Sequence, residues 1–264
     1  MKKLSFYLIF TFILAACSTK NPEIIVIKSK FTPSPDSVLI SSPENYNNEK
    51  KYPLVILLHG YSGNYTQWNT IVNLQDYSNT YNFIIACPDG FYDSWYINNP
   101  LKSDIQFEKF FWNDFIRYLT KSYSIDRNNI FISGLSMGGH GAITLFLKNP
   151  KFFKSAGSTS GILDLTYFPD RWSIKEGIGS IKDFPEVWQS NSAYFLLDST
   201  IHSDKKIFID CGIEDFAYKV NLNFAKKSID HNLDTKFISI PGDHSRKHWK
   251  KMIPQHFEFF YKQL

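Results

Sequence analysis

Residues 134–138 read GLSMG, a serine with glycines two positions before and two positions after it. This is the G-x-S-x-G pattern, in which a sharp turn between a strand and a helix lifts the serine hydroxyl off a sheet. An apolar run at 130–133 precedes the pattern, and a helical pattern at 139–148 follows it. We therefore predict that Ser136 is a nucleophile for acyl transfer. The alternative is a glycine-rich turn with an idle serine.

A histidine late in the chain is the expected base, because a serine hydroxyl is a poor nucleophile at neutral pH without one. Acid and then base follow the serine along the chain in proteins with this turn. His244 follows the apolar run 237–240 and a Pro-Gly-Asp turn, so it is the predicted base. His248 is the alternative, expected on the next helix and partly solvated. A surface histidine in a basic run is the third interpretation.

Several acidic residues after the serine could orient this base: Asp210, Glu214, Asp215 and Asp243. Asp210 ends a buried apolar run and is expected to be structural. Asp215 lies on the loop after that run, the usual place for an orienting carboxylate, and is the predicted acid. Glu214 remains its rival because loop geometry decides which of the two faces the imidazole.

Two backbone amides are expected to stabilise the oxyanion of the reaction. One belongs to Met137, directly after the serine, and the other to Tyr61 in the loop 59–63. We predict that His59, at the start of this loop, holds it through hydrogen bonds and is not a second base.

Continuous apolar runs, typical of strands buried on both faces, recur along the chain after two edge-like strands at 24–30 and 36–40. Helical patterns at 107–121, 139–148 and 218–231 separate most of them. Alternating strands and helices predict an α/β fold, a mostly parallel sheet with helices on both faces. The runs lie at 53–58, 83–86, 130–133, 153–158, 207–210 and 237–240.

Ligands of open parallel sheets bind outside the carboxyl ends of the strands, so the residues after each run should meet at one edge. The aromatic-rich segment 163–202 looks irregular and is expected to cover that edge. We name Trp95, Tyr96 and Trp249 as substrate-binding candidates, because aromatic faces suit sugar rings and planar acyl groups.

The first residues resemble a lipoprotein export signal. Lys2 and Lys3 precede an apolar run at 4–14, and residues 14–17 read LAAC. This predicts a signal peptide over 1–16, a diacylglyceryl anchor on Cys17, a tether over 17–23 and one catalytic domain over 24–264. The mature protein would then be held at a membrane of the bacterial cell envelope, facing the periplasm or the cell surface. An ordinary signal peptide with a chance cysteine is the alternative.

Composition limits the partners further. The net charge of +4 is modest and spread along the chain, so nothing predicts nucleic-acid binding. Histidines and cysteines lack the spacing of metal ligands, and neither a metal nor another cofactor is expected. Cys87 and Cys211 follow strands that should not be neighbours, so we expect no disulfide between them. The sequence leaves the oligomeric state open.

Most of the chain after residue 51 resembles the esterase family that contains esterase D (S-formylglutathione hydrolase), tributyrin esterases, feruloyl esterases and mycolyltransferases. The resemblance implies an α/β-hydrolase fold, a triad of Ser136, Asp215 and His244, and oxyanion amides at Tyr61 and Met137. The chain departs from the family after His244, where relatives often carry an acidic residue and a tryptophan. The matching motifs are LLHG at 57–60, SGN at 62–64, Trp68, PDG at 88–90, SWY at 94–96, GLSMGGHGA at 134–142, CGIEDF at 211–216, PGDH at 241–244 and Trp249.

Together these features predict a serine esterase that works through an acyl-enzyme. We expect short-chain or aromatic acyl esters, carried on a small molecule or a glycan. Acyl transfer by the same triad is one alternative, and a non-catalytic glycan-binding lipoprotein is another.

Overall fold

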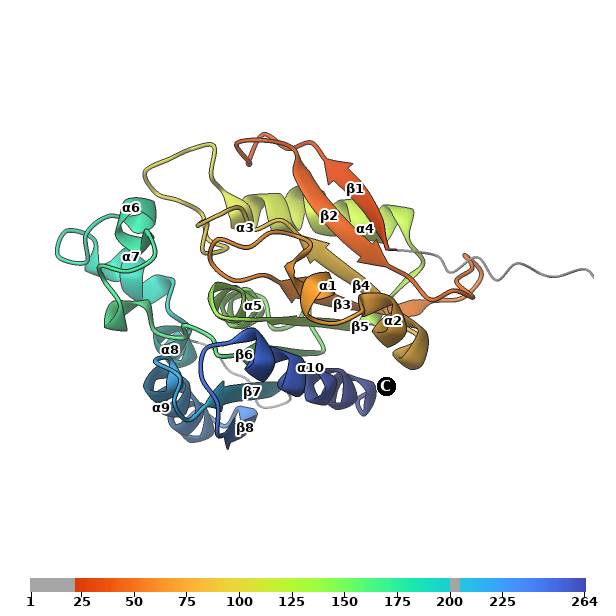
Figure 1. Cartoon of the computed structure of the whole chain (residues 1–264). Helices are drawn as coiled ribbons and strands as arrows, with labels where there is room; N and C mark the ends of the chain where they lie inside the picture. The colour runs from red at the N-terminus through yellow and green to blue at the C-terminus, as the bar shows by residue number, and fades with distance from the viewer. Residues whose placement is uncertain (1–21, 200–204) are drawn as a thin grey trace, which may run out of the picture.

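The computed structural model describes residues 22–199 and 205–264, which form an eight-stranded sheet with helices on both faces (Figure 1). The strand order is β1-β2-β4-β3-β5-β6-β7-β8, with β2 antiparallel to both of its neighbours and all other pairs parallel. Each predicted run is a strand, which confirms the predicted mostly parallel sheet. The strands are β1 (Glu23–Ile27), β2 (Asp36–Ser41), β3 (Tyr52–Leu58), β4 (Ile84–Pro88), β5 (Ile125–Gly134), β6 (Ser155–Thr159), β7 (Lys206–Gly212) and β8 (Asp234–Ile240).

The central strand β3 shows why the runs are apolar throughout. Leu54, Ile56 and Leu58 pack into the core on one face of the sheet. Val55 and Leu57 pack into the core on the other face. One face is covered by α3 (Phe107–Phe110), a π-helical segment (Phe111–Phe115), α4 (Ile116–Ser122), α5 (Met137–Lys148) and α9 (Tyr218–Asp230), and the other by α1 (Gln67–Ile71), α2 (Leu74–Tyr81) and α10 (Arg246–Tyr261).

Residues 160–199, between β6 and β7, lie largely beyond the carboxyl ends of the strands, at the left of Figure 1. The segment was expected to be irregular, but it contains short helices: α6 (Ile174–Ile178), α7 (Pro185–Ser190), α8 (Ala193–Leu196) and 3-10 turns at 165–167 and 197–199. The buried side chains of these helices are continuous with the core on one face of the sheet. Trp188 is fully buried there, and its Nε1 donates to the carbonyl of Gly179 at 3.0 Å. Residues 200–202 of the expected cover lie outside the described residues.

Two further sequence expectations concern the cysteines and the N-terminal signal. Cys87 on β4 and Cys211 on β7 are both free and buried, and β3, β5 and β6 separate their strands. The signal peptide, Cys17 and the tether up to residue 21 lie outside the described residues. Within the described part of the chain, no helix has both the length and the apolar character needed to cross a bilayer.

Candidate active site

Ser136 stands on the turn between β5 and α5 with a φ of 54° and a ψ of −117°. A positive φ is uncommon for a residue other than glycine and marks local strain. The two glycines of the GLSMG sequence are needed for close packing. A Cβ on Gly134 would overlap the carbonyl of Gly138, and a Cβ on Gly138 would overlap the carbonyl of Leu58 on β3. The turn is fixed by a bond from the Ser136 N–H to the Thr159 carbonyl at 3.0 Å.

A continuous chain of hydrogen bonds joins the three side chains of the predicted triad. Ser136 Oγ lies 2.9 Å from Nε2 of His244, and Nδ1 of His244 lies 2.9 Å from Oδ2 of Asp215. An ionised carboxylate can only accept, so Nδ1 carries the proton and Nε2 is free to accept the serine proton. The Asp215 side chain is fully buried, whereas 18% of the His244 side chain is exposed. The imidazole therefore meets both solvent and the serine hydroxyl.

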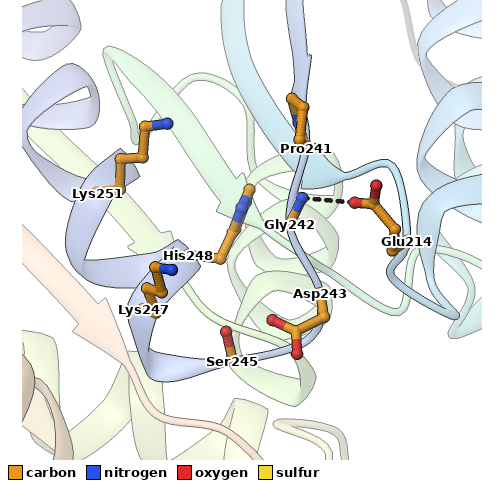
Figure 2. Close-up of a pocket in the computed structure, with 8 residues that line it drawn as sticks. All are labelled: Glu214, Pro241, Gly242, Asp243, Ser245, Lys247, His248 and Lys251. Carbon is orange, nitrogen blue, oxygen red and sulfur yellow. Dashed lines mark hydrogen bonds between the residues drawn. The ribbon is translucent and has the colours of Figure 1, made fainter.

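The two rival carboxylates at 214 and 215 point in different directions. Asp215 Oδ1 accepts the N–H of Ala217 at 2.8 Å, which fixes its side chain toward His244. Figure 2 shows the Glu214 carboxylate turned to the backbone of Gly242, whose N–H it accepts at 2.5 Å. The structure thus brings Asp215 to the imidazole, and Glu214 braces the loop before it.

His248, the alternative base, does not face Ser136. The expectation that it is partly solvated is wrong, because only 4% of it is exposed. Its Nε2 donates to Oδ1 of Asp210 at 2.8 Å. Asp210 itself is fully buried and also accepts from His256. The structure therefore places Asp210 and His248 behind the site.

The amides of Tyr61 and Met137 are free of hydrogen bonds to any described residue. Met137 is the first residue of α5, where an N–H has no partner within the helix. Tyr61 lies beside Ser136 in the wall of the same pocket. Two unpaired donors next to a serine hydroxyl can stabilise a negative oxygen that develops there.

Hydrogen bonds hold the loop that carries Tyr61. His59 Nε2 accepts the N–H of Gly90 at 2.7 Å, so the ring proton is on Nδ1, which donates to the Gly60 carbonyl at 2.8 Å. His59 thus ties the loop as expected. Gln67, which sequence reasoning missed, adds a second tie because its Oε1 accepts the N–H of Gly60 at 2.8 Å.

Aromatic side chains wall the pocket, whose volume is about 180 Å³. The Phe216 ring lies 4.3 Å from the His244 imidazole, and Trp249 meets that imidazole edge-on at 5.3 Å. Trp172, from the cover segment, lies 5.2 Å from Phe216. Phe216 was missed in the sequence, although it directly follows Asp215. The lining residues are Gly60, Tyr61, Gln67, Leu135, Ser136, Trp172, Phe216, His244 and Trp249.

Two of the three expected substrate contacts are absent from this wall. Trp95 and Tyr96 are 1% and 0% exposed, so neither can touch a ligand in the pocket. Trp95 Nε1 donates to the carbonyl of Trp172 at 3.0 Å, and the Tyr96 hydroxyl donates to the carbonyl of His59 at 2.8 Å. Their role is to support the loop and the cover segment, because the turn at 94–96 folds them inward.

A larger cavity of about 380 Å³ is lined by residues of the loop 241–245 and of the first turns of α10 (Figure 2). Lys247 and Lys251 line it, but Ser136 and His244 do not. Arg246 instead donates to the carbonyl of Thr70 at 2.6 Å. The basic run of the sequence is therefore split between different surfaces.

The chain is similar to known esterases in sequence and in fold. A family described as "Putative esterase" matches residues 29–260. The chain belongs to this esterase family. It is 28% identical to an acetyl esterase of Caldicellulosiruptor saccharolyticus, over 92% of this chain and 94% of the relative.

Solved structures share the fold over nearly the whole chain. A fluorophosphonate-binding serine hydrolase of Staphylococcus aureus superposes with a TM-score of 0.79 at 25% identity, over 92% of this chain and 99% of that one. A ferulic acid esterase gives a TM-score of 0.78 at 22% identity, over 92% and 98%. The fold is that of the α/β-hydrolases, and this chain is an esterase of the serine-hydrolase type.

Proposed function

We propose that this esterase hydrolyses short-chain carboxylic esters through an acyl-enzyme formed on Ser136. The observation that carries the proposal is the hydrogen-bond chain from Ser136 through His244 to Asp215, next to the free amides of Tyr61 and Met137. Each part has a separate role in acyl transfer, and all of them converge on one pocket.

In this mechanism Ser136 Oγ attacks the ester carbonyl carbon while its proton passes to Nε2 of His244. Asp215 stabilises the imidazolium, and the amides of Tyr61 and Met137 bind the negative oxygen of the tetrahedral intermediate. The intermediate collapses when the alcohol oxygen takes the proton from His244. A water molecule then attacks the acyl-serine by the same route, which releases the acid and restores Ser136.

The size and walls of the pocket favour a small acyl group on a carbohydrate. A cavity of about 180 Å³ cannot enclose a long acyl chain together with an alcohol. Trp172 and Trp249 offer aromatic surface of the kind that sugar rings and planar acyl groups contact. The full-length likeness to an acetyl esterase supports an acetyl group as the first candidate.

The proposal for location rests on the sequence. The LAAC motif at 14–17 supports a lipid anchor on Cys17 at the bacterial cell envelope. An anchored esterase of this kind would act on esters of imported or surface glycans. Its partners would then be the membrane, through Cys17, and the glycan ester.

The test combines active-site labelling with a substrate series. A fluorophosphonate should label the wild-type chain and not Ser136→Ala, because only an activated serine reacts. A series of p-nitrophenyl esters from acetyl to palmitoyl, beside acetylated and feruloylated oligosaccharides, should give the highest kcat/KM at the short end. Activity that rises steadily to palmitoyl with no turnover of any sugar ester would instead indicate a lipase.

A further inference from the structure

A buried carboxylate lies behind the site, near the carboxyl end of β7. Asp210 is fully shielded from solvent and accepts side-chain hydrogen bonds from Thr159 at 2.7 Å, His248 at 2.8 Å and His256 at 2.7 Å. Burial raises the pKa of Asp210, but the bonds from His248 and His256 outweigh it and leave the pKa below its usual value. Asp210 is therefore ionised, although the mechanism above does not use it.

The direction of each hydrogen bond follows from this charge. Because the carboxylate only accepts, both histidines donate from Nε2. Nδ1 of His256 then has a free lone pair, which accepts the hydroxyl of Ser133 at 2.9 Å. One carboxylate thus orders side chains on β5, β6 and α10.

The hydrogen bonds around Asp210 extend to the turn that carries Ser136. Ser133 lies on β5, three residues before Ser136. Thr159, whose hydroxyl donates to Asp210, uses its carbonyl to accept the N–H of Ser136 at 3.0 Å. Both strands that hold the strained serine are therefore tied to Asp210.

The contacts of Asp210 also extend, through His248, to the loop that carries His244. His248 lies on the first turn of α10, and its Nδ1 has no hydrogen-bond partner. That edge of the ring packs against Gly242, where an added Cβ would stand 3.0 Å from Nδ1 (Figure 2). Trp249, the next residue, contacts the His244 ring. A shift of His248 would therefore move the backbone both before and after His244, at Gly242 and at Trp249.

Stability alone is a weak reason for such a cluster. A buried ionic group is often no more stabilising than apolar residues of the same volume, because its desolvation is costly. Fixed directional bonds do, however, hold reacting groups in register, and a misplacement of about 1 Å costs roughly a hundredfold in rate. The contacts of Asp210 suit this second purpose.

We propose that Asp210 is a positioning residue that couples the nucleophile turn to the base loop, acting through His248 and His256. The inference rests on the proposed function, since it concerns the geometry of the same triad. It adds the requirement that Asp210 and its two histidines hold Ser136 and His244 at the correct distance. In folded variants, kcat should depend on whether the side chains at 248 and 256 still donate a hydrogen bond to Asp210.

The experiment uses amide side chains that mimic single ring nitrogens. Glutamine at 248 can place a donor where Nε2 stands, whereas asparagine cannot reach Asp210. We expect His248→Gln to keep kcat for p-nitrophenyl acetate within about threefold and His248→Asn to lower it about tenfold to a hundredfold, with KM little changed. The rate of fluorophosphonate labelling should fall in parallel. His231→Asn, a substitution of a partly exposed histidine beside Asp198, should leave both rates unchanged.

The second pair separates the two bonds of His256. His256→Gln keeps the donor to Asp210 and His256→Asn keeps the acceptor for Ser133, so the former should be the more active. All rates are measured at a temperature where circular dichroism shows every variant folded. Equal kcat values for Gln and Asn at 248 would overturn the positioning role, provided that Ser136→Ala is inactive. An active Ser136→Ala would overturn the proposed function, and this inference with it.

Discussion

The contacts of the site converge on His244. The Asp215 carboxylate holds its Nδ1, Phe216 lies over one face of the ring, and Trp249 meets the ring edge-on. An imidazole held in this way cannot rotate freely, so Nε2 stays directed at Ser136. The packing supplies the orientation that the proposed role of His244 as a general base requires.

Removing either the nucleophile or the base should abolish nearly all turnover. We expect Ser136→Ala and His244→Ala each to lower kcat for an activated ester by at least about a thousandfold, because the first lacks the nucleophile and the second lacks the base that activates it. Steady-state kinetics measure the loss, and circular dichroism checks the fold. Turnover close to that of the wild type in either variant would show that another group performs the reaction.

The two neighbouring acidic residues should differ in effect. Asp215→Asn should lower kcat far more than Glu214→Gln, because an amide at 215 no longer fixes the imidazole tautomer. Glu214→Gln keeps an acceptor for the Gly242 N–H and serves as the matched control. The measurement is kcat of both variants on one ester, and the reverse ranking would transfer the role to Glu214.

Spacing along the chain was enough to predict that Ser136 and His244 lie together, because each follows a recognisable run and turn. It left Asp215 and Glu214 open, since adjacent residues on a loop differ only in the direction of their side chains. His248 was misjudged because its burial depends on Asp210, which comes from a distant strand. Trp95 and Tyr96 were misjudged because a turn with positive φ at both positions folds them inward.

At the scale of elements, the cover segment is joined to the site by specific contacts. Trp95 binds the backbone of Trp172, and the Tyr61 hydroxyl lies 3.3 Å from that of Ser173. The strands were predictable because their apolar runs are continuous. The short helices of the cover were not, since helices of four to six residues are too brief to show a helical period.

The Trp172 side chain should limit the length of the acyl group. Trp172→Ala should raise the ratio of kcat/KM for hexanoate over acetate by about tenfold or more, because pocket shape discriminates methylene groups on that scale. The carbonyl that binds Trp95 is retained in this variant. Tyr167→Ala is the control, since Tyr167 is 44% exposed and outside the pocket wall. An unchanged ratio of hexanoate to acetate kcat/KM would mean that Trp172 does not limit the length of the acyl group.

At the scale of the whole molecule, buried histidines link the layers of the fold. His140 on α5 is fully buried, and its Nε2 lies 2.6 Å from the carbonyl of Asn191 beyond α7. Burial lowers the pKa of His140 to about 4. Helix α5, which follows Ser136, and the cover segment are therefore joined by an imidazole that stays neutral near pH 7.

This histidine should make stability depend on pH. Unfolded His140 titrates near pH 6.5, so between about pH 6.5 and 4 the unfolded state binds a proton that the folded state does not. The free energy of unfolding should fall across this window as pH falls, by about 3 kcal/mol from this group. Urea unfolding at several pH values should show a shallower loss in His140→Gln and an unaltered loss in His231→Gln. Equal slopes in all three proteins would contradict the assignment.

The direction of the sheet bears on how an anchored protein would face its substrate. β1 is antiparallel to β2, which is antiparallel to β4, so β1 begins at the amino ends of the parallel strands. Ser136 follows the carboxyl end of β5, at the opposite edge. Glu23 lies six positions after Cys17, a span of at most roughly 20 Å. A lipid on Cys17 would thus keep the amino end of β1 within roughly 20 Å of a bilayer, on the opposite edge of the sheet from Ser136.

Cys17→Ala should release the protein from the membrane fraction of cells, because acyl chains on this cysteine would supply the insertion energy. Ser18→Ala is the matched control and should stay with the membranes. The released variant should keep the kcat of the anchored protein on a soluble ester, since the site lies at the far edge of the sheet. Sedimentation of Cys17→Ala with membranes would rule out the lipid anchor. A loss of activity on release would show instead that the membrane side of the fold contributes to the pocket.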